Sequence, residues 1–251
     1  DTRDAPLPAL GADTVRALAD RTHGIGCDQL ILLEDDPEAT VRMRIYNADG
    51  GEVEACGNAS RAIGLLLGDP ATIATAGGLI STTPEAGGIA VDMGEPRFEW
   101  EEIPLAYPMD TASMPLGWDM LEQPSAVNVG NPHVVFFVED CDAVPLDRLG
   151  PQIEHDEVFP KRINVNVATV VDRQTVRLRV WERGVGLTRA CGTGACATAI
   201  AAMRRGLVER KVTVHLPGGP LGIAWAEDNR ITMTGPATEA FRGTFEWGDY
   251  A

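Results

Sequence analysis

Apolar and polar residues alternate over residues 41–46 (VRMRIY), which is the period of a strand with one buried face. Residues 176–181 (VRLRVW) repeat this pattern without a gap at an offset of 135 positions, and the same offset brings Cys56 onto Cys191. Each copy predicts a strand, a loop, an Ala-Cys-Gly sequence and a helix. The chain therefore contains one supersecondary unit used twice.

The segments that follow the two cysteines are apolar on nearly all sides. Residues 60–67 and 194–203 show no polar face, so we expect two helices that are buried all round. A further short helix is expected over residues 13–22, closed by Gly24.

Short apolar runs bounded by Gly and Pro predict many strands, clearest over 30–33, 87–93, 134–138, 163–171 and 211–216. The chain of 251 residues has room for two domains. We predict an α+β fold of two pseudo-symmetric lobes, each a mainly antiparallel sheet wrapped around a central buried helix. The lobes are placed at residues 1–107, with Cys56, and 108–237, with Cys191, joined through the acidic, proline-containing stretch 101–121.

The net charge of the chain disfavours two classes of binding partner. The chain has 37 acidic and 21 basic residues, a formal net charge of -16, which disfavours nucleic acid and anionic membrane surfaces. No run of about 18 apolar residues is present and residues 1–4 are polar, so we expect neither a membrane span nor a signal peptide.

The five cysteines, an odd number, favour free thiols in a reducing cytoplasm over a disulfide framework. The four histidines form no HxxH pattern, and Cys191 and Cys196 lack the CxxC spacing. We therefore expect no metal, with a thiol-based metal site as a weaker alternative.

Cys56 and Cys191 each stand at a predicted loop-to-helix junction with a glycine next in sequence. A helix start stabilises a thiolate and lowers its pKa, and its amides can hold a carboxylate. Two duplicated units commonly pack about a pseudo-two-fold axis, so we expect the thiols to face each other across a cleft. Two opposed bases suit racemisation or epimerisation, and such thiols are expected to form a disulfide under oxidation.

Several longer motifs resemble diaminopimelate epimerases, in the order that this family shows. These motifs are Asn47-Ala48-Asp49-Gly50, Ala55-Cys56-Gly57-Asn58, Gly130-Asn131-Pro132-His133, Trp181-Glu182-Arg183-Gly184 and Ala190-Cys191-Gly192-Thr193-Gly194. The segment 24–29 and the region of Asn164 are similar too.

The resemblance implies a cofactor-independent enzyme of lysine and peptidoglycan biosynthesis that interconverts LL- and meso-diaminopimelate. It implies that Cys56 and Cys191 are acid and base, supported by His133 and Glu182. It also implies a small amino-acid substrate, a homodimer, and a return of residues 238–251 to the first lobe. The implied substrate contacts are Gln29, Asn47, Gly57, Asn58, Asn131, Asn164, Arg183, Gly192 and Thr193.

The sequence departs from the family pattern at two places. Family members usually begin with a strand that carries Gly-Asn-Asp-Phe, whose Asn touches the substrate; none precedes Asp1, so we expect either a shortened chain or the loss of that strand. Ala59 stands where glycine is commoner, and we expect it to be tolerated because Cys56 and Gly57 remain.

Each site residue also has an ordinary structural interpretation. His133 could be a capped core histidine, Asn47 could serve its turn, and Arg183 could be a surface charge. For the whole chain the alternatives are a proline or hydroxyproline racemase, against which Asn164 and Arg183 count, and an inactive binding protein on the same scaffold.

Overall fold

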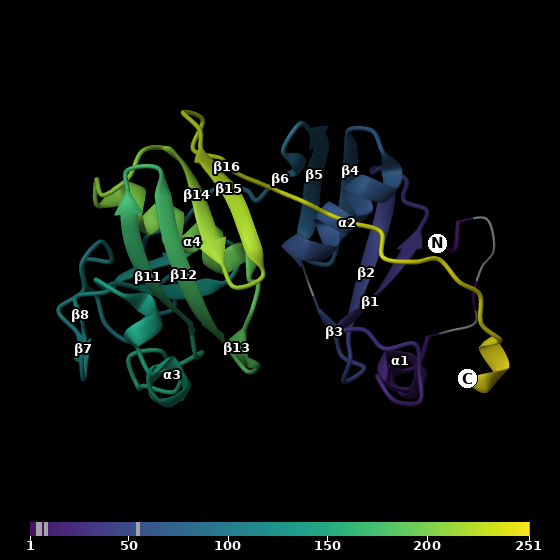
Figure 1. Ribbon diagram of the computed structural model, residues 1–251, viewed down its shortest axis with the longest axis horizontal. Helices are drawn as coiled ribbons and strands as arrows, with labels where there is room; N and C mark the ends of the chain where they lie inside the picture. The colour runs from purple at the N-terminus through teal and green to yellow at the C-terminus, as the bar shows by residue number, and fades with distance from the viewer. Residues whose placement is uncertain (4–6, 8–9, 54–55, 251) are drawn as a thin grey trace. The chain divides into compact units, whose positions relative to one another are not determined.

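The structure is a computed structural model that describes residues 1–3, 7, 10–53 and 56–250 (Figure 1). It divides into two compact units: unit 1 comprises Asp1–Val91 and Pro236–Ala251, and unit 2 comprises Asp92–Gly235. Both units are dominated by strands, so the predicted α+β class is confirmed.

Unit 1 is built from helices α1 and α2 and from strands β1–β6 (Figure 1). Strand β2 lies between β1, its antiparallel neighbour, and β4, its parallel neighbour, and β3 extends the same sheet from β2. The antiparallel ladders β4–β5 and β5–β6 complete the sheet. The bounds are α1 Ala12–Ala19, α2 Gly57–Leu67, β1 Gln29–Glu34, β2 Val41–Asn47, β3 Glu52–Val53, β4 Ala71–Thr75, β5 Gly78–Glu85, β6 Gly88–Asp92 and, near the C-terminus, the 3-10 helix η2 Trp247–Asp249.

Unit 2 holds a larger sheet in the order β16-β15-β14-β12-β11-β10-β9, with β13 paired to β12. Two of its ladders, β10–β11 and β12–β14, are parallel, and the others are antiparallel. The bounds are β7 Gly117–Trp118, β8 Leu121–Glu122, β9 Ser125–Asn128, β10 Pro132–Phe137, η1 Cys141–Ala143, α3 Leu146–Glu154, β11 Asn164–Asp172, β12 Thr175–Glu182, β13 Gly186–Thr188, α4 Gly192–Arg204, β14 Lys211–Leu216, β15 Gly219–Trp225 and β16 Ile231–Gly235.

The internal repeat extends to the topology of the two units. In unit 1, β2 pairs with β1, β3 and β4, and β4 leads to β5 and β6. In unit 2, β12 pairs in the same senses with β11, β13 and β14, and β14 leads to β15 and β16. Helices α2 and α4 follow β3 and β13 at corresponding places. One strand plan thus ends twice in a helix that begins one residue after a cysteine.

The two repeated helices differ in burial. Helix α4 contacts β9, β10, β11, β12, β14, β15 and β16, and its residues from Gly194 to Met203 are all buried, as predicted. Helix α2 packs against β4 and β5 but exposes Leu65 and Leu66. The expectation that α2 is buried on all sides was wrong, because the sheet of unit 1 covers only one side of this helix.

The stretch 101–121, which the sequence marked as a connection between lobes, supplies core residues to unit 2. Ile103, Leu105, Met114 and Leu121 are buried in one cluster with Phe136. The contacts accordingly place residues 92–107 in unit 2, whereas the predicted boundary between the lobes lay after residue 107. They place the C-terminal tail, from residue 236 on, in unit 1. Prolines and acidic residues in this stretch obscured its widely spaced core positions.

Among the helices that the structure describes, none is long and apolar enough to cross a membrane.

Gly150 of α3 gives a test of packing in unit 2. A Cβ atom there would lie 2.5 Å from the Trp181 ring, so Gly150→Ala is expected to lower the free energy of unfolding by about 1–3 kcal/mol. Gly222→Ala is the matched control, because its Cβ would meet Thr234 O at 3.6 Å. Urea unfolding followed by tryptophan fluorescence measures both. Equal stability of the two variants would contradict the described contact of α3 with β12.

Candidate active site

Cys56 stands at the start of α2 in unit 1. Its backbone is extended (φ -150°, ψ 114°), and the helix begins at Gly57. The carbonyl of Cys56 accepts from the amide and the hydroxyl of Ser60, both at 3.0 Å. The first amides of a helix have no intrahelical acceptor, so Gly57 and Asn58 offer donors beside the thiol. Glu54 and Ala55, part of the repeated motif, lie outside the described residues.

Gln29 and Asn47, both predicted substrate contacts, lie opposite each other at the ends of β1 and β2. The Gln29 Nε2 donates to Asn47 Oδ1 at 2.9 Å. The side chain of Asn58, by contrast, is exposed and accepts from Arg61 at 2.9 Å. The side chain of Asn58 is thus bonded within its own helix, and the contact of its backbone amide with substrate stays a prediction.

Cys191 holds the corresponding place at the start of α4 in unit 2. Its backbone is again extended (φ -139°, ψ 107°), and its side chain is buried. The sulfur accepts from the Gly194 amide at 3.3 Å and lies 3.6 Å from Thr193 Oγ1. The sulfur thereby caps its own helix.

The pKa of Cys191 moves in the direction opposite to the one that the sequence predicted. Burial, and after it the Glu182 carboxylate, raise the pKa of the Cys191 thiol to about 12 against the lowering influence of Thr193 and Gly194. The helix start does stabilise a thiolate, but desolvation outweighs it. Cys191 is consequently an S–H group at neutral pH, and the nearby Glu182 carboxylate accepts a hydrogen bond from the Thr188 hydroxyl.

His133 lies in the core of unit 2 at the start of β10. Its Nε2 contacts Asn131 Oδ1 at 2.9 Å and its Nδ1 contacts Asn166 Nδ2 at 3.1 Å. Burial, with a smaller contribution from the Arg183 charge, lowers the pKa of His133 to about 3 against the raising influence of Asn166. The ring is therefore neutral, and both of its nitrogens are engaged by amides.

Asn164, the first residue of β11, links the start of β10 to the turn after β12. Its Nδ2 donates to the carbonyl of Pro132 at 2.9 Å, and its Oδ1 accepts from the Arg183 amide at 2.9 Å. The side chain is almost completely buried. The guanidinium of Arg183 is exposed and donates to Lys161 O at 3.2 Å. Asn164 thus fixes the backbone from which Arg183 projects.

Glu154 was not predicted, yet it holds the turn that carries Glu182 and Arg183. The Glu154 residue is 2% exposed, and its carboxylate accepts from Trp181 Nε1 at 2.7 Å and from the Gly184 amide at 2.9 Å. The helical period of α3 contained a signal, because Glu154 lies on the face that buries Gly150 and Ile153. The second residue that sequence reasoning missed, Asn166, shows no such pattern.

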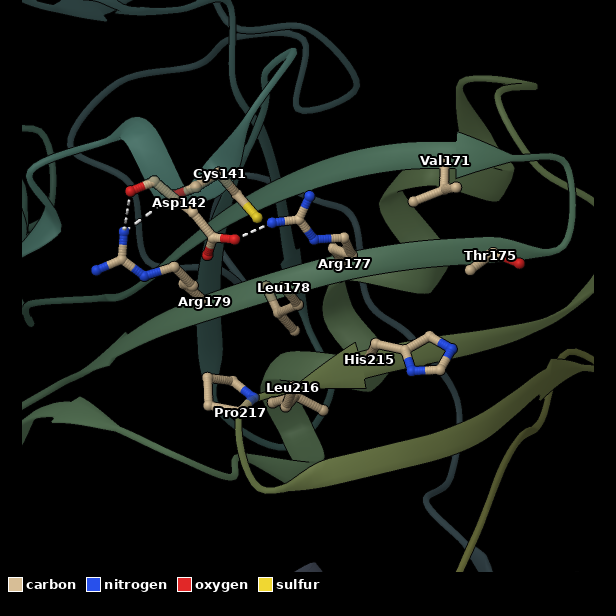
Figure 2. A pocket seen from close by; sticks show the side chains of 10 residues that line it. All are labelled: Cys141, Asp142, Val171, Thr175, Arg177, Leu178, Arg179, His215, Leu216 and Pro217. Atoms are coloured by element: carbon tan, nitrogen blue, oxygen red, sulfur yellow. Dashed lines mark hydrogen bonds and ion pairs between the residues drawn. The ribbon is translucent and has the colours of Figure 1, made fainter.

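A hollow of about 550 Å³ in unit 2 lies apart from these residues (Figure 2). Its charged groups are paired within the protein: Arg177 binds Asp142, and Arg179 donates to the carbonyls of Cys141 and Val144 at 2.9 and 2.8 Å. None of the predicted site residues lines it. The lining residues are Cys141, Asp142, Val171, Thr175, Arg177, Leu178, Arg179, His215, Leu216 and Pro217.

Asp140, Cys141 and Asp142, beside this hollow, hold ligand atoms within 4.8 Å of one another. Arg177 ion-pairs with both carboxylates, and a guanidinium at that place opposes a cation. No such grouping of at least three His, Cys, Asp or Glu side chains includes Cys56 or Cys191 among the residues with described positions.

Replacing Glu182 tests the charge balance around Cys191. Glu182→Gln removes a negative charge that raises the pKa of Cys191, so the thiolate fraction rises at a fixed mildly alkaline pH. Alkylation of Cys191, followed by peptide mass spectrometry, is expected to be at least about threefold faster, since the thiolate is the nucleophile. Asp119→Asn, which removes a carboxylate bonded to Arg148 at 2.6 Å, is the control. An unchanged rate in Glu182→Gln would contradict the assigned contact.

Two solved structures resemble this chain in fold at low sequence identity. A Bacillus anthracis phenazine biosynthesis protein of the PhzF family matches with a TM-score of 0.64 and 15% identity, over 91% of this chain and 88% of the other. A hydroxyproline epimerase from Agrobacterium vitis, solved with trans-4-OH-L-proline, matches with a TM-score of 0.61 and 15% identity, over 92% and 84%. These likenesses support the fold.

The sequence comparisons are far more specific. A family profile described as diaminopimelate epimerase matches residues 2–99 and 125–239. Proteins named diaminopimelate epimerase from Erythrobacter litoralis and Sphingopyxis alaskensis are 67% and 59% identical, and in each case the alignment covers 100% of this chain and 93% of the relative. The chain belongs to the diaminopimelate epimerase family.

Proposed function

We propose that the protein interconverts LL- and meso-diaminopimelate by proton transfer between two thiols, Cys56 and Cys191, without a cofactor. The observation that carries the proposal is the repeated position of the two cysteines. Each precedes the helix of its repeat by one residue, in an extended conformation. The relatives named diaminopimelate epimerase supply the choice of substrate.

The proposed reaction conserves electrons and needs no oxidant. One sulfur, as thiolate, removes the α-proton: an S–H bond forms, the C–H bond breaks, and its electron pair delocalises into the α-carboxylate. The second thiol gives its proton to the opposite face of the carbon, which forms the new C–H bond and leaves a thiolate. The roles exchange in the reverse reaction. A neutral resting Cys191 suits the proton donor when Cys56 is the base.

The helix starts supply stabilisation for the intermediate. Amide donors aimed at the substrate carboxylate favour the negative charge that develops when the α-proton leaves. Gly57 and Asn58 offer such donors at α2, and Gly192 and Thr193 offer them at α4. Glu182, whose negative charge raises the pKa of Cys191, takes up the thiol proton when Cys191 acts as base.

The distal amino-acid head of diaminopimelate distinguishes this substrate from proline. Arg183 is exposed and is held at its backbone by Asn164; one guanidinium nitrogen donates to Lys161 O, and a guanidinium carries five N–H donors with which it can also pair with a carboxylate. A proline or hydroxyproline racemase, the second candidate, needs no such head group. The retained acid, base and supporting residues count against an inactive binding protein.

The wider role follows from the proposed substrate. We place the enzyme in the cytoplasm, in lysine and peptidoglycan biosynthesis, and as a homodimer. The negative net charge of -16 agrees with a small charged metabolite as substrate, and it disfavours nucleic acid or a membrane as partner.

Chiral chromatography of the products tests the substrate. The protein is expected to convert LL-diaminopimelate to the meso form and to leave L-proline unchanged. Cys56→Ser and Cys191→Ser are each expected to lower kcat about 10²–10⁴-fold, because a positioned acid or base is lost. Cys27→Ser is the control, since Cys27 lies outside both helix starts. Conversion of proline alone would overturn the choice of substrate.

Oxidation tests whether the two thiols reach each other. Diamide treatment is expected to abolish activity through a Cys56–Cys191 disulfide, since this bond forms only when the Cα atoms come within about 7 Å. Dithiothreitol restores activity, and peptide mass spectrometry identifies the linked pair. The control Cys141→Ser keeps this response. Full activity after oxidation, with no such linked peptide, would contradict the proposed shared substrate.

A further inference from the structure

We propose that Asn166 is a positioning residue that sets the tautomer of His133 and thereby decides which side-chain atom Asn131 presents to substrate. Asn166 lies on β11, is fully buried and belongs to none of the motifs that mark the site. The inference rests on the proposed function for its effect on substrate, whereas the tautomer itself is a property of the protein alone.

The orientation of the Asn166 amide is fixed by a backbone carbonyl. Its Nδ2 donates to Val134 O at 3.0 Å, and the same nitrogen lies 3.1 Å from His133 Nδ1. A carbonyl oxygen can only accept a hydrogen bond, so the nitrogen, and not the oxygen, of the amide must face Val134. His133 Nδ1 is therefore the acceptor of an N–H from Asn166.

The tautomer of His133 follows from that bond. A neutral imidazole has one N–H, and when Nδ1 accepts, the hydrogen is on Nε2. His133 Nε2 then donates to Asn131 Oδ1, which lies 2.9 Å away. Asn131 is held with its oxygen toward the ring, so its Nδ2, with two N–H donors, points away from it. Burial, which lowers the pKa of His133 to about 3, keeps this arrangement neutral near pH 7.

The oxygen of the Asn166 amide lies beside Gly194, in the first turn of α4. Asn166 Oδ1 is buried and has no hydrogen-bond partner among the described residues. A Cβ atom on Gly194 would lie 2.8 Å from this oxygen and 3.2 Å from Cys191 Sγ. The amide oxygen and the sulfur thus border the same glycine. Asn166 connects the Asn131–His133 pair with the start of α4, and a larger residue at 194 would separate them.

In the proposed reaction, the orientation of the Asn131 amide decides whether the substrate carboxylate meets a hydrogen-bond donor or an acceptor. An Asn131 amide that presents N–H groups binds a substrate carboxylate, whereas one that presents its oxygen repels it. Asn166→Asp replaces the donating nitrogen by an acceptor, which favours a hydrogen on His133 Nδ1. The donor and acceptor roles in the hydrogen bonds from Asn166 through His133 to Asn131 then reverse, and Asn131 turns its oxygen away from the His133 ring. Asn166→Ala removes the constraint without reversing it.

The experiment combines nitrogen NMR with kinetics on the full chain. In ¹⁵N-histidine-labelled protein, assigned with His133→Gln, the wild type is expected to show His133 protonated at Nε2. Asn166→Asp moves the proton to Nδ1, and Asn166→Ala gives a mixture. The KM for LL-diaminopimelate rises about tenfold in both variants, as for the loss of one hydrogen bond, with a smaller change in kcat.

Thr198→Val is the matched control for a change in the buried interior of unit 2. Thr198 is fully buried in α4, and its hydroxyl has no partner among the described residues. This variant is expected to keep the wild-type tautomer of His133 and the wild-type KM. If its KM rose as much as that of the Asn166 variants, the effect of Asn166 would be one of packing, and the proposal would be overturned.

Measuring the His133 tautomer in the unsubstituted protein tests the proposal even if a variant fails to fold. A wild-type His133 protonated at Nδ1 would overturn the proposal without any variant or substrate. If the protein shows the Nε2 tautomer but does not convert diaminopimelate, the proposed function is refuted, and the assignment of the His133 tautomer to Asn166 stands.

Discussion

The start of a helix immediately after an extended cysteine is the constraint on which the structure of the site depends. A helix begins with amide groups that lack intrahelical acceptors, and a residue that is not yet helical can turn its side chain back toward them. In α4 the sulfur of Cys191 does this with the Gly194 amide at 3.3 Å. In α2 the same backbone conformation recurs at Cys56. The strands and turns around each helix serve to hold this junction.

The residues around Cys191 and His133 in unit 2 keep hydrogens in defined positions, and both of these side chains are neutral. Burial favours the neutral forms of both Cys191 and His133, raising the pKa of the thiol and lowering that of the imidazole. The fixed dipoles of buried asparagine amides then take the place of water. Such a site is preorganised for moving one proton, because no solvent must reorganise when the proton moves.

The repeat and the site motifs could be predicted from the sequence, because they rest on local order. A constant offset of 135 relates Gln29 to Asn164, Asn47 to Glu182, and Cys56 to Cys191, and the strand pairing is repeated in the same senses. Helix starts, strand periods and turn residues all follow from neighbours along the chain.

Properties set by tertiary burial could not be predicted in this way. The pKa of Cys191 rises because of what surrounds it, although its place on a helix favours a lower value. Leu65 is exposed although its segment is apolar on nearly all sides. Glu154 and Asn166 act through bonds to residues about 30 positions away, and although the helical period of α3 marks Glu154 as buried, residue spacing along the chain does not identify these partners.

The central claim, that two thiols act from opposite faces of one carbon, is tested most directly by early-time isotope distribution. LL-diaminopimelate is incubated with the protein in deuterated water, and α-deuterium is measured separately in product and in remaining substrate. Two monoprotic thiols predict meso product that carries one solvent deuterium, with recovered substrate still unlabelled. Product that retains the substrate's own hydrogen would show that a single base serves both faces, and would contradict the account.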